Sequence, residues 1–587
     1  MSRPAIRIAN FSAYSGDRPT ALAEVLEGDP VDVLIGDYLA EITLAPMALH
    51  YRRDPSKGYA ETFVEHLRPH LAMIAERGLK VVANAGGFNP AGLADALRAD
   101  IAACGTDLRV AHVDGDNLLD TLDELRSNGH ELEHLDTGRP FSDWGFEPIS
   151  ANAYLGGWGI AAALEAGASI VVTGRVSDAS LVAGPSAWWH GWGREDWGRL
   201  AGAVTAGHVI ECGPHATGAN FSGFTQIPGV EHAGYPIAEV AEDGSSVITK
   251  HSGAGGAVTV DTVTAQFVYE IQGPRYLNPD VTVHFDSIEI EQAGVDRVRI
   301  KPVLGSPPPP TTKVAIFAKI GYQVVQTVFV TAPRVEDKIA LLRRQLDAVL
   351  DDGIDRLEIT PLGVAADNPP NQWAATVPVR VMATASTPEP LSRSKFSEAL
   401  DSLYCGSIPG YFLDGGAQRV TKPWARVDYW PALLPATVLS HRAVLDDSTA
   451  IYIDAPTTTQ APQKLAHPEP ASRTVSLDDR RVELGTIAHA RSGDKGGNSN
   501  IGVWVSNPAA WDWLRSTLTS EEFRQLVPET KELDIVRHEF PHLNAVHFIL
   551  RGLLGTGGSS NMRVDQVGKA VGEYLLAKHV SVPEHLL

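Results

Sequence analysis

Apolar runs and helical patterns alternate along roughly the first 180 residues of the chain. Apolar residues recur with helical spacing over residues 19–26, 58–77, 90–103 and 117–128. The apolar runs around these segments are Ile6–Ala9, Val31–Ile35, Leu79–Ala83, Leu108–Ala111 and Ser169–Val172. Strands that alternate with helices in this way are typical of a parallel sheet. The pattern therefore predicts an α/β domain with a doubly wound, mostly parallel sheet.

Each apolar run ends in polar residues, in glycine or in both. Asp37 follows the second run, and Asn84, Gly86 and Gly87 follow the third. In a parallel sheet all carboxyl ends lie on one edge, and ligands bind in the crevice outside that edge where the strand order reverses. We therefore expect these residues to share one pocket.

The rest of the chain differs from this first part in pattern and composition. Helical spacing continues over residues 152–165, whereas residues 201–235 are rich in Gly, His and Asn and are predicted to form a loop that lines the site. Alternating strands dominate after about residue 274, and a stretch rich in Pro, Thr, Gln and Ala has the composition of a linker. The predicted division is a core domain over residues 1–275, an α+β middle region over 276–454, a linker over 455–480 and a C-terminal domain over 481–587.

The C-terminal domain is predicted to be a small antiparallel sheet with helices. Residues 491–498 are predicted to form a loop between two of its strands. The other predicted strands and helices lie at 482–484, 486–490, 500–505, 508–518, 521–526, 533–538, 545–550 and 566–578. Helices packed on such a sheet give a ferredoxin-like arrangement.

Composition and charge narrow the class of protein. Hydrophobic residues make up 44% and charged residues 20% of the 587 residues, as in a globular enzyme. No apolar stretch reaches the length of about 18 residues that crosses a bilayer. The formal charge of −22 would repel nucleic acid and anionic lipid, and the three cysteines have no metal-site or disulfide spacing. We expect a cytoplasmic homo-oligomer that acts on a small molecule and binds neither nucleic acid nor membrane.

The most specific local feature is the segment from Arg491 to Asn498. Its glycines, Gly496 among them, free the backbone to form an N–H concavity, and Arg491 and Lys495 add cationic donors. Such a loop suits a phosphate or carboxylate, although it is not a Walker A motif. The alternative is a tight turn in which Asp494 and Lys495 pair at the surface.

Arg175, Ser177 and Asp178 come directly after the fifth apolar run and precede a predicted helix. Arg175 could bind an anionic group, and Ser177 or Asp178 could cap the helix. The alternatives are a structural ion pair for Arg175 and a purely structural cap for Asp178.

Carboxylates at two other strand ends are candidates for acid–base chemistry. His112, Asp114 and Asp116 follow the fourth run, where they could hold a divalent cation or supply a general base. The alternative, and the more common explanation of such residues, is that they form Asx turns. Asp37, desolvated in the crevice, could have a raised pKa and act as an acid or base.

His208, Glu211, Cys212 and His215 form the densest cluster of reactive side chains in the sequence. Cys212 could be a nucleophile with His208 or His215 as its base, or simply a buried thiol. A metal set is also open, although the spacing lacks the HExxH order.

Several of these segments resemble the acyclic terpene utilisation A (AtuA) family. The matching segments are Asn84–Gly87, Thr173–Asp178, Ala206–Gly213 and Ser252–Ala257, with Arg491–Gly496 and Asn500–Gly502 resembling the family's ferredoxin-fold tail. The resemblance implies a role in degrading citronellol-type terpenes through branched acyl-CoA thioesters. Residues 213–216 depart from the family's pattern, which leaves a role for His215 in doubt.

Three hypotheses follow from the residues and the resemblance. The first is an enzyme that hydrates or cleaves a branched or terpenoid acyl-CoA or carboxylate by acid–base chemistry. In that enzyme Asp37, Asp114, Asp116 or His208 would move protons, and Arg175 and Lys495 would hold the anionic end. Asn84 and the N–H groups of the glycine loops would stabilise an enolate-like oxygen. No cofactor is firmly implied, and the CoA moiety of the substrate and a divalent cation are the two that stay open. The second hypothesis is hydrolysis of a thioester or amide through Cys212, and the third is a non-catalytic scaffold subunit of a catabolic complex.

Overall fold

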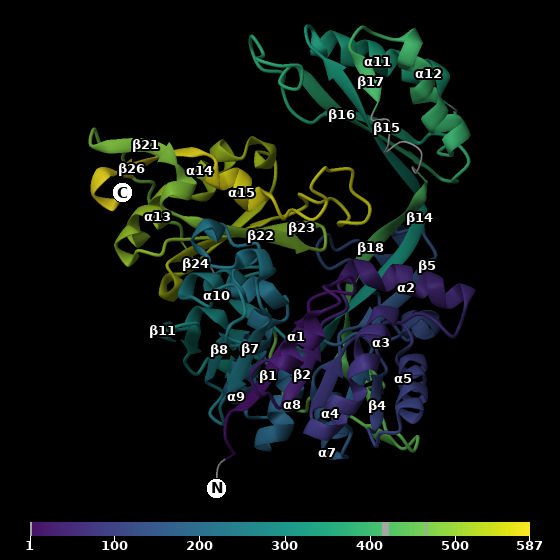
Figure 1. Ribbon diagram of the computed structural model, residues 1–587, viewed down its shortest axis with the longest axis vertical. Coiled ribbons are helices and arrows are strands. Elements are labelled where there is room, and N and C mark those ends of the chain that lie inside the picture. The colour runs from purple at the N-terminus through teal and green to yellow at the C-terminus, as the bar shows by residue number, and fades with distance from the viewer. Residues whose placement is uncertain (1–2, 351, 414–421, 464, 466–467) are drawn as a thin grey trace.

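The computed structural model describes residues 3–350, 352–413, 422–463, 465 and 468–587. Residues 464, 466 and 467 of the predicted linker lie outside this description. Figure 1 shows a main body, a lobe that projects from it, and a terminal domain that lies against the main body. Among the described residues, no helix combines the length and apolar character that crossing a bilayer requires.

The main body is built on a sheet with the strand order β11-β12-β8-β7-β1-β2-β3-β6-β4-β19-β20. Its central strands are parallel to one another and lie close to the predicted positions. They are β1 (Ile6–Ser12), β2 (Val33–Gly36), β3 (Lys80–Ala83), β6 (Ile170–Thr173) and β4 (Val110–Asp114). The outer strands are β7 (Pro236–Val240), β8 (Ser246–Lys250), β11 (Ile290–Gly294), β12 (Arg297–Ile300), β19 (Arg442–Val444) and β20 (Ala450–Tyr452). Because these outer strands all pair antiparallel, the expectation of a mostly parallel sheet holds for the centre of the sheet alone.

Alternate residues of the central strands are buried on opposite faces of this sheet. Ile8 and Ile35 face one apolar core, and Ala9 and Leu34 face the other, as the two-residue period of a strand requires. The first core contains α7 (Trp158–Glu165), α8 (Ser180–His190), α9 (Trp197–Ile210) and α10 (Val260–Phe267). The second contains α1 (Ala21–Glu27), α2 (Glu41–Arg53), α3 (Glu61–Leu67), α4 (Leu71–Arg77) and α5 (Pro90–Cys104).

Two predictions for this region are wrong. The helix predicted over 152–165 begins at Trp158, because Asn152 belongs to strand β5 (Pro148–Ala153). The loop predicted over 201–235 begins after α9, which is almost entirely buried between the sheet and its neighbouring helices.

One long strand, β14 (Thr311–Thr331), connects the main body to the projecting lobe (Figure 1). Its first half pairs with β5 and with β18 (Trp424–Pro435). Its second half pairs with β16 (Thr376–Ala385) and β17 (Tyr411–Leu413), and β15 (Arg356–Pro361) extends the sheet beyond β16. α11 (Val335–Val349) and α12 (Glu398–Gly406) cover the core of the lobe. The other α-helices and strands described outside the terminal domain are α6 (Leu122–Ser127), β9 (Arg275–Leu277), β10 (Thr282–His284) and β13 (Gly305–Ser306).

The terminal domain is an antiparallel sheet in the order β22-β23-β25-β24 with helices on one face. Its strands are β22 (His489–Lys495), β23 (Asn498–Trp504), β24 (Ile535–Phe540) and β25 (Ala545–Leu550). The other elements are α13 (Trp511–Thr517), α14 (Ser520–Leu526), α15 (Val571–Leu576) and the pair β21 (Asp479–Glu483) and β26 (His579–Pro583). The loop predicted over 491–498 is instead the end of β22 and a tight turn into β23. This β22–β23 hairpin reaches over the main body, toward the carboxyl ends of the central strands (Figure 1).

Candidate functional site

Asp37 and Asn84 meet just beyond the carboxyl ends of β2 and β3. Asn84 donates from Nδ2 to Oδ1 of Asp37 at 2.6 Å and accepts from the backbone N–H of Tyr38 at 2.6 Å. Asn84 is fully buried, and Asp37 is 7% exposed. The amide of Asn84 therefore holds the Asp37 carboxylate in one orientation. Both its nitrogen and its oxygen are hydrogen-bonded to protein atoms.

Gly86 and Gly87 form the turn that follows Asn84. The N–H of Gly86 donates to the carbonyl of Thr173 at 3.0 Å, and the N–H of Gly87 donates to the carbonyl of Asn84 at 3.3 Å. Because both N–H groups are engaged within the protein, the predicted role of this turn as a donor to a substrate oxygen is wrong. Gly86 ties the end of β3 to the end of β6, and Gly87 closes the turn on Asn84.

Arg175 crosses the same edge from the end of β6. Its Nη1 donates to the carbonyl of Leu39 at 2.6 Å and pairs with Oδ1 of Asp178 at 2.7 Å. Its guanidinium also lies 4.2 Å from the ring centroid of Tyr154. Arg175 is 2% exposed, so this cation is buried among a carboxylate, a carbonyl and an aromatic face.

The sequence predicted that Ser177 or Asp178 could cap the following helix, but neither residue does so. The N-cap of α8 is Ala179, which makes no side-chain cap. Ser177 accepts a hydrogen bond of 2.7 Å from Asn278, and Asp178 faces Arg175 instead. The carboxylate of Asp178 is thereby brought to the site rather than to the helix backbone.

His208 and Glu211 lie at the carboxyl end of α9, one helical turn apart. Nδ1 of His208 is 3.2 Å from Oε1 of Glu211, and the two residues are 1% and 6% exposed. Oε2 of Glu211 has no hydrogen-bond partner in the described part of the chain. The imidazole also packs against Tyr276 and Phe285, with ring centroids 5.1 Å and 5.4 Å away.

Asp37 and Glu211 have strongly perturbed pKa values. Burial raises the pKa of each carboxyl well above its usual range, and repulsion from Asp178 raises both further. Arg175 acts in the opposite direction on both, and the charge of Glu211 raises the pKa of Asp37 further. Burial likewise lowers the pKa of His208 to about 4, so the imidazole is neutral at neutral pH. The site thus contains two buried carboxyls whose raised pKa values oppose ionisation, and a neutral histidine that contacts one of them, Glu211.

The terminal domain contributes cations to this cluster. Lys495, at the tip of the β22–β23 hairpin, lowers the pKa of both Glu211 and His208, which shows that its charge is felt at both groups. Arg491 donates to the carbonyl of Asn220 at 3.1 Å, and its Nη2 lies 3.0 Å from Nδ1 of His215. The hairpin thus anchors on the segment that follows α9 and brings its lysine to the carboxylates.

The other predicted residues of the hairpin have structural roles. Gly496 takes a φ of +63° in the turn, a backbone conformation that favours glycine. Asn498 donates to Asp136 at 2.9 Å and accepts from the N–H of Gly552 at 3.0 Å. Asp494 lies opposite Ser499 in the strand register. The predicted concavity of free N–H groups for a phosphate is therefore replaced by a strand pair with a cationic tip.

Family comparisons cover both parts of the site. The family described as "Acyclic terpene utilisation family protein AtuA" matches residues 6–445, and "AtuA ferredoxin-like domain" matches residues 482–581. The chain belongs to the AtuA family. Membership implies a role in acyclic terpene utilisation and assigns the terminal domain to the ferredoxin-like class. No curated protein and no solved structure is significantly similar to the chain.

In this AtuA protein Cys212 does not have the surroundings of a nucleophile. Burial raises the pKa of its thiol well above the usual range, and Glu211 and Glu270 raise it further. His208 faces Glu211 and His215 faces Arg491, so neither imidazole is bound to the thiol as its base. A reactive cysteine needs the opposite environment, in which nearby cations favour the thiolate.

Asp114 and Asp116 do not join the carboxylates of the AtuA site in a metal centre. Arg442 binds both oxygens of Asp114 at 2.8 Å and 2.6 Å. Asp116 accepts from the N–H of Arg175 and from Asn152, both at 2.8 Å. Burial alone would raise the pKa of Asp114, but the bonds from His112 and Arg442 outweigh it and lower that pKa. Within the described residues, no group of three or more His, Cys, Asp or Glu side chains is arranged to hold a metal ion.

Sequence reasoning missed Glu270 and Tyr276 as members of this site. Glu270 repels Glu211, and it follows α10 in a backbone conformation with a φ of +52°. Its N–H donates to Asn500 of the terminal domain at 3.0 Å. A single carboxylate after a helix carries no local signal, because its role arises from a contact with a domain more than 200 residues away.

Proposed function

We propose that the chain is an enzyme that adds water to, or cleaves a carbon–carbon bond in, a branched or terpenoid acyl-CoA or carboxylate by acid–base chemistry. The observation that carries this proposal is that the site holds two buried carboxyls, Asp37 and Glu211, whose pKa values are both raised, and that Glu211 contributes to the rise at Asp37. Enzymes that exchange protons at carbon near neutral pH use carboxyls tuned in this way. Membership of a terpene-utilisation family supports the substrate class.

The two carboxyls can divide the work of hydration between them. One is ionised and takes a proton from water as the water oxygen bonds to the β-carbon of an enoyl group. The other is protonated and gives its proton to the α-carbon, to which the electron pair of the double bond moves. In the lyase direction, the ionised carboxyl takes the proton of a β-hydroxyl, the α–β bond breaks, and the protonated carboxyl delivers its proton to the departing enolate carbon. Protons balance in both schemes.

Other residues of the site have supporting roles in this proposal. Arg175 is committed to Asp178 and to a backbone carbonyl, so it positions a carboxylate. Lys495, at the tip of a hairpin, is better placed to hold the anionic end of the substrate. Asn84 fixes the orientation of Asp37.

The test is turnover of branched thioesters, followed by mass spectrometry. 3-Methylbut-2-enoyl-CoA and a branched 3-hydroxyacyl-CoA serve as the first probes. Addition of one water to the enoyl thioester indicates a hydratase, and appearance of a shorter thioester indicates a lyase. Asp37→Asn and Glu211→Gln should each abolish the reaction, whereas Glu231→Gln, at an exposed position, should not. Absence of turnover on both probes and on longer terpenoid thioesters would contradict the proposal.

A further inference from the structure

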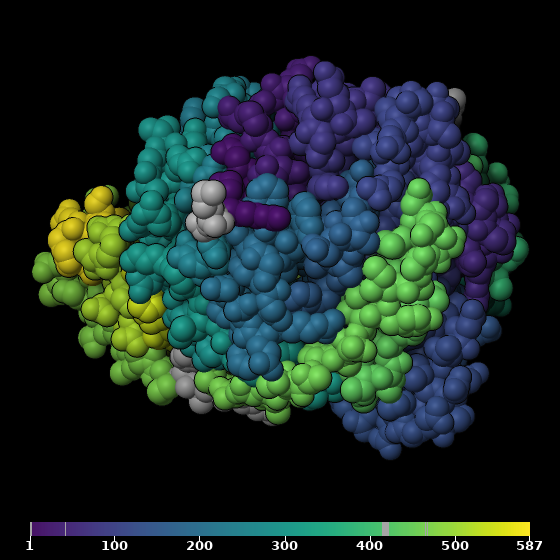
Figure 2. Space-filling view, turned by 90° about the horizontal axis from the view of Figure 1, so that it is seen from below, coloured from purple at the N-terminus to yellow at the C-terminus, as the bar shows by residue number. Residues whose placement is uncertain are grey.

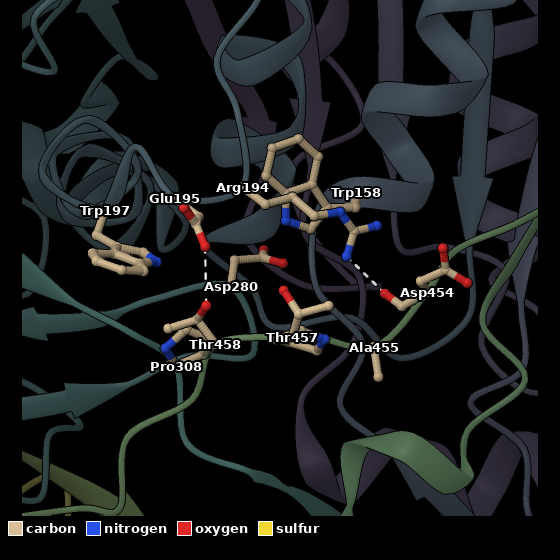
Figure 3. A pocket seen from close by; sticks show the side chains of 11 residues that line it. Trp158, Arg194, Glu195, Trp197, Asp280, Pro308, Asp454, Ala455, Thr457 and Thr458 are labelled. Carbon is tan, nitrogen blue, oxygen red and sulfur yellow. Dashed lines mark hydrogen bonds between the residues drawn. The ribbon is translucent and has the colours of Figure 1, made fainter.

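A cavity outside the candidate site lies where the predicted linker crosses the main body. Its volume is about 140 Å³, and it is lined by residues from five separate segments (Figure 3). The segment that follows β20 forms one wall and runs across the surface of the main body (Figure 2). Thr458 of this segment donates to Glu195 at 2.9 Å, which fixes the linker over the cavity.

Arg194 supplies positive charge to this cavity. Its Nη1 donates to the carbonyl of Asp454 at 2.6 Å, and its guanidinium lies 5.2 Å from the ring centroid of Trp158. A carbonyl oxygen and an indole ring carry no net charge, so these two contacts orient the guanidinium without neutralising it. Arg194 can therefore still bind a carboxylate.

Asp280 supplies negative charge to the same cavity. Its Oδ2 accepts from the N–H of Gly157 at 2.6 Å, and the residue is 6% exposed. Burial raises the pKa of Asp280 to about 6. The positive charge of Arg194 acts against that rise, so the two charges attract each other. Figure 3 shows the Asp280 carboxylate among the side chains that surround the cavity. At pH values above 6 this carboxylate can bind an ammonium group.

The size and the walls of the cavity limit what can occupy it. A cavity of about 150 Å³ accommodates benzene, a molecule of six heavy atoms. Trp158 and Trp197 form apolar walls, and Thr457 adds a hydroxyl. Glu195, whose carboxylate accepts from Thr458, and Asp454 also line the cavity. A ligand that fits it is therefore small, carries both charges and has a short apolar part.

We propose that this cavity binds a small zwitterion with one carboxylate and one ammonium group, the size of a short amino acid. Arg194 binds the carboxylate, Asp280 binds the ammonium group, and the indole rings cover the carbon atoms between them. Asp280 is joined to the candidate site through Asn278, which accepts from the N–H of Asp280 at 3.1 Å and donates to Ser177 at 2.7 Å.

The experiment is a titration of the full chain with L-alanine, a zwitterion of six heavy atoms, followed by ligand-observed NMR. Sodium acetate and methylammonium chloride, at matched ionic strength, present each charge alone. We expect saturable binding of alanine, with at least about tenfold weaker binding of either single-charge probe. Arg194→Gln should weaken alanine binding by about tenfold or more. The matched control is Arg199→Gln, at an exposed arginine that pairs with Asp196, and it should bind like the wild type.

Three results would overturn the proposal. They are no saturable binding of alanine to the wild type, equal binding by Arg194→Gln, or binding of acetate or methylammonium as tight as that of alanine. Asp280→Asn should also lose binding, but Asp280 supports the start of α7, so its melting temperature is measured alongside. If Asp280→Asn does not fold, the comparison of Arg194→Gln with Arg199→Gln decides the question.

Discussion

The side chain of Asn84 donates a hydrogen bond of 2.6 Å to the carboxylate of Asp37, at the point where two parallel strands of the main sheet end. This bond favours the ionised form of Asp37, against burial and the repulsion of Asp178, which favour the protonated form. The protonation state of Asp37 is therefore set by a balance that a single substitution can move.

Asn84→Asp removes the donor and places a second carboxyl beside Asp37. Because two adjacent buried carboxyls resist simultaneous ionisation, we expect the variant to lose about 1–3 kcal/mol of stability, with a larger loss at alkaline pH. Denaturant unfolding on both sides of neutrality measures this difference. Asn128→Asp, at an exposed position after α6, should unfold like the wild type at both pH values. A pH-independent loss in Asn84→Asp would contradict the assignment of a buried carboxyl at Asp37 that resists ionisation.

Asp116 makes stability depend on pH in a direction that can be predicted. Burial raises its pKa from 3.8 to about 6, so the folded protein holds a proton that the unfolded chain releases between these values. This stabilising contribution is complete below pH 3.8 and is lost as the pH rises through about 6. The advantage of the wild type over Asp116→Asn should therefore shrink by about 3 kcal/mol across this window. Asp120→Asn, at an exposed position, is the control, and a difference that grows with pH would contradict the assignment.

Lys495 should be detectable at His208, although the two residues lie in different domains. After burial, repulsion by Lys495 is the next largest cause of the lowered pKa of His208, which is about 4. In Lys495→Met this pKa should rise, and an NMR titration of the imidazole would show it. Lys531→Met, at an exposed lysine of the terminal domain, should leave the titration unchanged. An unchanged titration in Lys495→Met would show that the charge of Lys495 does not act on His208.

Cys212 should be inert toward alkylation. The raised pKa of its thiol leaves little thiolate at mildly alkaline pH, whereas Cys104 and Cys405 are exposed. Mass spectrometry after treatment with iodoacetamide should find Cys104 and Cys405 modified before Cys212. Cys212→Ala should keep turnover within about twofold of the wild type. Rapid modification of Cys212, together with loss of turnover in the alanine variant, would restore the hydrolase hypothesis.

The centre of the fold could be predicted because its signals are local. Strands that alternate apolar residues between two faces and end in polar tips are readable from the sequence, and the structure places Asp37, Asn84 and Arg175 at the ends of such strands. The cluster around His208 and Glu211 is dense enough in sequence to stand out in the same way.

Helix α9 could not be predicted because it contains glycines, which have low helix propensity but allow close packing. A side chain at Gly202 would place its Cβ 1.9 Å from the carbonyl oxygen of Gly244, so the small residues let the helix lie against the turn between β7 and β8. Helix propensity alone predicts a loop at the same glycines.

The β22–β23 hairpin of the terminal domain, predicted as a loop over residues 491–498, could not be predicted for a related reason. Arg491 contacts the imidazole of His215 in the main body, and the charge of Lys495 acts on Glu211, so polar residues replace the alternation expected of a strand. The predicted role of Asp114 as a metal ligand or general base failed because its partner is remote in sequence. The arginine that binds it, Arg442, lies 328 residues away. Local rules fail most often where distant segments build a site.

Incorporation of solvent deuterium into the α-carbon of a branched acyl-CoA tests the central claim most directly, because hydration and carbon–carbon cleavage both deliver a solvent proton to that carbon. The wild type, incubated with 3-methylbut-2-enoyl-CoA or a branched 3-hydroxyacyl-CoA in heavy water, should give a deuterated thioester. Asp37→Asn and Glu211→Gln should give none, and Glu231→Gln should match the wild type. Deuterium incorporation that persists in both Asp37→Asn and Glu211→Gln, or that is absent from the wild type on every branched thioester offered, would contradict the account.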